Sequence, residues 1–118
     1  MVEVLLSAAL ICFPVHGERQ CHPALIGNRT YPGEYQLIQR LTDQPGYGGD
    51  VLQYDEGDTS IFAIHRVWTL KPEQKREHRL SSGDPKQRKG ITAGCVNVAP
   101  AVYDALVSCC HSSRLVIK

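Results

Sequence analysis

Two short segments carry the residues best suited to chemistry. Residues 60–67 (SIFAIHRV) place His65 in an apolar, β-branched run, and residues 91–98 (ITAGCVNV) place Cys95 directly after Gly94. A cysteine acts as a nucleophile when a base lies within hydrogen-bond reach and backbone N–H groups face the developing oxyanion. The two segments therefore indicate a candidate thiol–imidazole pair, although a Gly-Cys pair in an apolar run is more often a packing feature when taken alone. We expect Gly94 to let a substrate backbone approach and to allow an unusual backbone conformation.

The cysteine count is odd, with Cys12, Cys21, Cys95, Cys109 and Cys110. In an oxidising compartment, two disulfides at most would leave one thiol over, whereas in a reducing compartment all five would be free. If the domain is exported, pairing of Cys12 or Cys21 with Cys109 or Cys110 is one alternative, because chain termini often lie close together. Adjacent cysteines rarely bond to each other, so no Cys109–Cys110 bond is expected. An enzyme is expected to show one cysteine with a depressed pKa, and no cysteine–histidine spacing matches a zinc site.

The sequence predicts mainly β-strands for the elements that position this thiol–imidazole pair. Strand-like patterns alternate with Gly- and Pro-rich turns, and Pro100 opens a predicted helix over residues 101–107. On the strand at 60–67, Ile61, Ala63 and His65 are predicted to share one face, opposite Phe62 and Ile64. We expect a single domain over residues 1–118, with strands at 1–13, 34–41, 51–54, 60–67 and 114–118 and turns at 14–23, 28–33, 42–50 and 55–58.

A basic stretch separates the two chemical segments. Residues 71–90 hold seven Lys and Arg against three Asp and Glu, and Pro72 suits the first turn of a helix. Such a run is usually a solvated face, and its functional interpretation is attraction of acidic substrates. Aromatic side chains do not interleave it, so nucleic-acid binding is disfavoured.

Composition excludes several classes of protein. The 118 residues carry a formal net charge of +1, with 42% hydrophobic and 21% charged residues. These values are those of a globular chain and exclude a disordered chain or a globally basic nucleic-acid binder. No stretch approaches the roughly 20 apolar residues that span a bilayer. Residues 5–13 read either as part of a first strand or as the apolar core of a targeting signal, with no Lys or Arg before them.

The order of these features resembles the L,D-transpeptidase catalytic-domain family (YkuD-like) over the whole chain. In that family a histidine on a strand precedes a [Ser/Thr]-His-Gly-Cys-hydrophobic-[Asn/Arg] motif. The upstream histidine is matched by His65 in AIHR, and the motif by Thr92, Gly94, Cys95, Val96 and Asn97. Residues 24–37 (ALIGNRTYPGEYQL) are similar to the family's Gly-rich turn before a Thr-Pro-x-Gly-x-aromatic strand.

The sequence departs from the family pattern at two points. Ala93 stands where the family usually has histidine, so any contact of that second imidazole is missing. The interval from His65 to Cys95 is longer than usual, and the basic stretch would fill it as a lid or rim over the site. His78, which lies 17 residues before Cys95, is a competing base. We favour His65 because its strand context matches.

The resemblance implies a curved sheet or β-sandwich with one short helix after the nucleophile, and cysteine-dependent acyl transfer on peptidoglycan stem peptides. Cys95 would attack the bond between the L-centre of a diamino acid and a terminal D-residue, with His65 as the base. The acyl group would pass to an amine, or to water in an L,D-carboxypeptidase or wall-damaging hydrolase. A catalytically dead peptidoglycan-binding module is the rival from another class.

The resemblance also implies roles for neighbouring groups. Backbone N–H groups at Gly94 and Cys95 would bind the oxyanion, while Thr92 and Asn97 would position the loop. Substrate-rim positions are assigned to Arg66, Trp68 and His78. No metal or organic cofactor is required, the partner is a stem peptide, and the expected location is the periplasm, the cell envelope or the outside of a bacterial cell.

Overall fold

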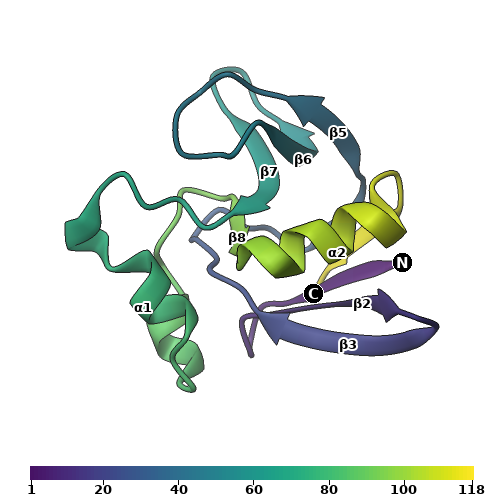
Figure 1. The fold of residues 1–118 in the computed structure, drawn as a ribbon, viewed down its shortest axis with the longest axis horizontal. Helices are drawn as coiled ribbons and strands as arrows, with labels where there is room; N and C mark the ends of the chain where they lie inside the picture. Colours follow the sequence, from purple (N-terminus) through teal and green to yellow (C-terminus); the bar gives the residue numbers. More distant parts are fainter.

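Two β-sheets form the frame of the molecule (Figure 1). The computed structural model describes all residues from Met1 to Lys118. The first sheet has the strand order β3-β2-β1-β9-β4, and the second has the order β5-β6-β7-β8. The strands are β1 (Val2–Leu5), β2 (Leu10–Val15), β3 (Glu18–Pro23), β4 (Gly33–Gln36), β5 (Ile38–Leu41), β6 (Asp50–Glu56), β7 (Ile61–Arg66), β8 (Val96–Val98) and β9 (Arg114–Ile117).

Helix α2 (Pro100–Cys110) lies across both sheets and packs against β2 and β7 (Figure 1). It begins at Pro100, which occupies the first helical turn, where the missing N–H of proline costs nothing. Its Tyr103 and Leu106 are fully buried. They join a core drawn from both sheets, with Val4, Ile11, Phe13, Leu52, Ile64, Val96, Leu115 and Ile117 among its members. The fold is therefore mainly β with one helix after Cys95, as predicted. No helix of the structure is long and apolar enough to cross a membrane.

The pairing of β7 with β8 positions the chemical segments. The two strands run parallel, with Ile64 opposite Val96 and His65 opposite Asn97. β8 is entirely buried, and β7 is buried over Ala63–His65, which includes Ile64 and His65 beside β8, as expected for strand segments covered on both faces. The ladder therefore places His65 beside the segment that begins with Cys95, although 30 residues of chain separate the two.

Several predicted element boundaries are wrong. Residues 14–23 contain strand β3, not only turns, and residues 1–13 form two antiparallel strands rather than one. The predicted strand at 34–41 is divided between the two sheets at Leu37, whose buried side chain marks the corner. Only Val96–Val98 of the apolar segment 91–98 is a strand.

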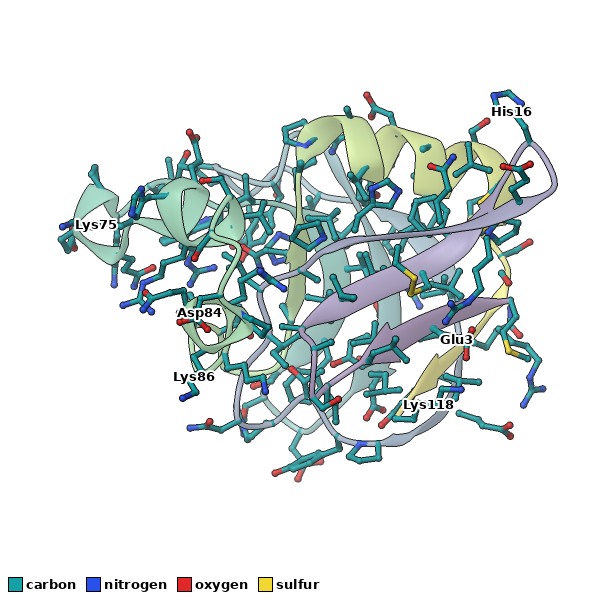
Figure 2. All side chains as sticks on the ribbon, turned by 90° about the horizontal axis from the view of Figure 1, so that it is seen from below. Glu3, His16, Lys75, Asp84, Lys86 and Lys118 are labelled. Carbon is teal, nitrogen blue, oxygen red and sulfur yellow. A yellow bond between two sulfur atoms is a disulfide. The ribbon has the colours of Figure 1, made fainter.

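The disulfides also differ from the expected pairing. Cys12 bonds to Cys21, its directly opposite partner in the β2–β3 hairpin, and Cys109 bonds to Cys110 at the end of α2. The termini do lie together, since β1 pairs with β9 and Lys118 forms an ion pair with Glu3 (Figure 2). The cysteines, however, are not at those ends. Two disulfides leave Cys95 as the one free thiol.

The basic stretch projects sideways from the sheets, with Lys75 at its far end (Figures 1 and 2). It contains the short helix α1 (Arg76–Leu80) between two 3-10 turns, Pro72–Gln74 and Pro85–Arg88. It is not only a solvated face, because Arg88 is 4% exposed and donates to the carbonyls of Ala8 and Ala9 at 2.9 and 3.1 Å. This buried arginine fastens the stretch to the β1–β2 turn.

Candidate active site

Cys95 and His65 share the walls of two cavities. The larger has a volume of about 430 Å3 and is also lined by Ile61 and Ala63, which confirms the predicted alternation along β7. The smaller, of about 200 Å3, lies between the same two residues and the segments around Trp68 and Arg76. Sγ of Cys95 lies 3.7 Å from the Ile61 carbonyl oxygen. No hydrogen bond joins the thiol directly to the imidazole in this structure, so the pair is brought together but not bonded.

The tautomer of His65 follows from its neighbours. The Asn97 Oδ1 atom accepts from the Trp68 backbone N–H at 3.1 Å and from the Arg76 guanidinium at 3.0 Å. Both groups can only donate, so the other end of this amide, Nδ2, faces Nε2 of His65 at 3.5 Å. Nε2 must then carry the lone pair. Consistently, Nδ1 lies 2.7 Å from the Arg66 carbonyl oxygen, to which it donates its proton.

The electrostatic environment keeps both reactive groups uncharged at neutral pH. Burial lowers the pKa of His65 to about 4, against the smaller raising effect of its hydrogen bond to Arg66. Burial raises the pKa of the Cys95 thiol, although the Ala63 backbone and the Arg76 charge oppose it. The expectation of a depressed thiol pKa is therefore wrong, because removal from water outweighs the nearby positive charge. The resting pair is a thiol beside a neutral imidazole.

Three hydroxyl groups hold the loop that carries the thiol. The Gly94 carbonyl accepts from the hydroxyl of Tyr54 at 2.6 Å and from that of Thr30 at 3.0 Å. The hydroxyl of Thr92 donates to the Cys95 carbonyl at 2.6 Å. Within one planar peptide the C=O and N–H point in opposite directions. Fixing the Gly94 carbonyl therefore fixes the direction of the Cys95 N–H, which has no hydrogen-bond partner in the structure.

Gly94 is required for space, not for an unusual backbone conformation. Its φ is not among the positive values of the chain. A Cβ at this position would overlap the ring of Phe62 and lie 3.1 Å from the Arg29 carbonyl oxygen. The expectation of an unusual backbone conformation at Gly94 is wrong. The close packing of the Phe62 ring explains why this position has no side chain.

Of the three expected rim residues, only Trp68 lines a cavity with Cys95. The guanidinium of Arg66 points elsewhere, forming an ion pair with Asp50 at 3.0 Å and lying 4.3 Å from the ring centroid of Tyr103. His78 is exposed on α1 and lines a separate depression with Lys71 and Lys75. His78 lines neither of the two cavities that contain Cys95. No cluster of three or more His, Cys, Asp or Glu side chains forms a metal site.

Sequence reasoning missed Tyr54 and Thr30 as site residues, and it did not distinguish Arg76 from the other charges of the basic stretch. Tyr54 read as an ordinary strand residue, Thr30 lay in a turn cluster, and Arg76 was one of seven basic residues in its stretch. Their contacts to residues 94–97 cross from distant parts of the chain. No local signal distinguishes them.

Comparison with solved structures shows which known proteins share this fold. No family model and no curated protein matches the sequence. Among solved structures, L,D-transpeptidase 3 from Mycobacterium tuberculosis superposes with a TM-score of 0.69 at 9% identity, over 99% of this chain and 60% of that one. The L,D-transpeptidase LdtMt1, solved in complex with imipenem, gives a TM-score of 0.64 at 13% identity, over 99% and 57%. The fold is thus that of L,D-transpeptidase structures, and the chain spans less than two thirds of each of these two.

Proposed function

We propose that this protein is a cysteine acyltransferase that acts on peptidoglycan stem peptides by L,D-transpeptidase chemistry. The observation that carries the proposal is the position of the one unpaired cysteine. It shares two cavities with a buried histidine of defined tautomer, in a fold shared with L,D-transpeptidases. A wall substrate would place the protein in the cell envelope.

The first half of the reaction uses groups on this chain alone. Nε2 of His65, which carries a lone pair, takes the thiol proton as Sγ of Cys95 adds to the scissile carbonyl. Because both groups rest uncharged, proton transfer accompanies the attack and does not precede it. The Arg66 carbonyl, which accepts from Nδ1, stabilises the imidazolium that forms.

The oxyanion of the tetrahedral intermediate needs a fixed donor. The unpartnered N–H of Cys95 is suited to this role, since the hydroxyls of Tyr54 and Thr30 hold its peptide in place. One such donor typically contributes about 3 kcal/mol to transition-state stabilisation. The imidazolium then protonates the leaving amine, the C–N bond breaks, and a thioester remains on Cys95.

The thioester is resolved by a nucleophile that His65 deprotonates in turn. An acceptor amine gives a cross-link, and water gives a trimmed stem peptide. Both outcomes use the same groups, so the wild-type product distribution decides between transpeptidase and L,D-carboxypeptidase action.

The test is mass spectrometry of purified muropeptides incubated with the protein. Trimmed or cross-linked stem peptides are expected with the wild type and none with Cys95→Ser. The matched control replaces the exposed Cys109 by Ser and the buried Cys110 by Ala, which removes their disulfide, keeps the core apolar and leaves Cys95 in place; it should give the wild-type products. Intact muropeptides after incubation with folded wild-type protein would overturn the proposal in favour of a binding module.

A further inference from the structure

Arg76 is the one cationic side chain that the smaller cavity shares with Cys95. Its Nε donates to Gln74 at 2.8 Å, its Nη1 donates to Asn97 at 3.0 Å, and its guanidinium lies 5.1 Å from the ring centroid of Trp68. These contacts hold the group on three sides. Its Nη2 makes no hydrogen bond, and no acidic side chain lies within ion-pair distance of Arg76.

Arg76 differs from the buried Arg88, which also lacks an acidic partner, because all three guanidinium nitrogens of Arg88 donate to backbone carbonyls. Arg66, which is also partly buried, is paired with Asp50, and the exposed Arg19 and Arg114 are paired with Glu3 and Glu34. Taking a guanidinium out of water without a counter-charge costs free energy. Every enclosed side-chain nitrogen in the structure has a hydrogen-bond partner, so the unpartnered Nη2 atom of Arg76 is not fully enclosed; Arg76 lines both the smaller cavity and the depression that contains His78.

We infer that Arg76 binds the free α-carboxylate of the D-residue that leaves when Cys95 is acylated. The inference rests on the proposed function and specifies its substrate. In a peptide, the carboxyl carbon of the last residue lies within about 4 Å of the carbonyl carbon before it. A carboxylate on Arg76 therefore places the preceding carbonyl near the thiol. Ala93, which lines the same cavity with a single methyl group, leaves space for the leaving residue.

The step balances without any further reactant. The thiol proton moves to Nε2 of His65, Sγ bonds to the carbonyl carbon, and the C–N bond to the terminal residue breaks. The imidazolium proton goes to the amine nitrogen, so a free D-amino acid leaves with its carboxylate still charged. Recognition of that carboxylate restricts the enzyme to the end of a stem peptide and excludes bonds inside longer peptides.

The experiment compares two donors that differ only at the C-terminus. One is a synthetic stem tetrapeptide ending in a diamino acid and D-alanine with a free carboxylate, and the other is its C-terminal amide. The release of D-alanine or D-alaninamide is followed by mass spectrometry for the wild type, Arg76→Met, Arg76→Lys and Arg79→Met. Arg79 lies on the same helix but lines a different depression, so Arg79→Met is the matched control.

The wild type is expected to prefer the acid, and Arg76→Met should lower kcat/KM for the acid by about 10- to 100-fold, as for the loss of a charge-assisted hydrogen bond. The amide should be little affected, Arg76→Lys should keep part of the preference, and Arg79→Met all of it. Equal losses for both donors would overturn the inference and make Arg76 a positioning residue for Asn97 and His65. Turnover of both donors without preference by the wild type would overturn this inference alone, whereas turnover of neither would overturn the proposed function with it.

Discussion

The side-chain amide of Asn97 lies 3.5 Å from Nε2 of His65, and the two residues are register partners in the β7–β8 ladder. The backbone pairing therefore sets the distance between the imidazole and the nucleophile segment. Asn97 is fully buried and anchored by two donors to its Oδ1, so the imidazole has little freedom to rotate. The resting site therefore holds a neutral imidazole in the same cavities as Cys95, with its Nε2 lone pair facing the Asn97 amide and no ion pair to the thiol.

His65 and His78 are distinguished by replacing each with alanine. Because His65 supplies the only imidazole beside the thiol, His65→Ala should slow acylation of Cys95 by about 10²-fold or more. The exposed His78 lies in a separate depression, and His78→Ala should leave the rate unchanged. Stopped-flow measurement of acylation by a carbapenem checks both variants. A large loss in His78→Ala with wild-type rates in His65→Ala would reverse the assignment.

Burial of a neutral His65 makes stability depend on pH. The pKa of this imidazole is about 4 in the folded protein, against 6.5 for an ordinary histidine. Below pH 6.5 the unfolded chain binds a proton that the folded chain does not, so stability falls as pH decreases from 6.5 to about 4. The total loss is up to about 3 kcal/mol, and no effect of this group is expected above pH 7.

Urea unfolding of the wild type and of His65→Gln at a series of pH values measures this effect, because other titrating groups are common to both proteins. The difference between the two unfolding free energies should change over this pH range and be constant above it. A difference that is independent of pH from 4 to 7 would contradict the buried, neutral imidazole.

The thiol of Cys95 should titrate later than an ordinary thiol. Burial raises its pKa in the fold, so the rate of alkylation by iodoacetamide should rise with pH to a midpoint above that of the unfolded chain. Cys95 is the only free cysteine, which makes the mass shift unambiguous. A midpoint below the unfolded value would indicate a resting thiolate–imidazolium pair instead.

Tyr54 should matter to catalysis through the Gly94 carbonyl that it holds at 2.6 Å. Tyr54→Phe removes one of two hydroxyl donors to that oxygen, with an expected stability cost of about 1 kcal/mol. Looser positioning of the Cys95 N–H should lower kcat more than KM. The control is Tyr35→Phe, which loses an exposed hydrogen bond to the Tyr31 carbonyl. Equal kinetic effects of the two variants would contradict a role of the Tyr54 hydroxyl in positioning the Cys95 N–H.

The predictability of the fold differs between central and edge strands. β7 was predictable because its apolar, β-branched residues lie in the buried centre of a sheet. β3 was not, since all but one of its residues are exposed at an edge and the hydrophobic pattern that marks a strand is absent. The separation of β4 from β5 depends on a corner at Leu37, which local patterning does not reveal.

The same contrast holds for the site. That His65 and Cys95 lie at one cavity could be predicted, because each stands in a local motif of the sequence. Tyr54 and Arg76 could not, because their roles depend on partners 40 and 21 residues away. The direction of the Cys95 pKa shift could not be predicted from the sequence either. Burial of the thiol outweighs the nearby positive charge, and the extent of that burial is known only from the fold.

The central claim, that Cys95 is the acyl-accepting nucleophile, is tested most directly by trapping the acyl-enzyme. The protein is incubated with a carbapenem, its intact mass is measured, and the modified peptide is mapped. The account predicts a single adduct on Cys95 in the wild type and in His78→Ala, and none in Cys95→Ser. An unmodified wild type, or an adduct that persists in Cys95→Ser, would contradict it.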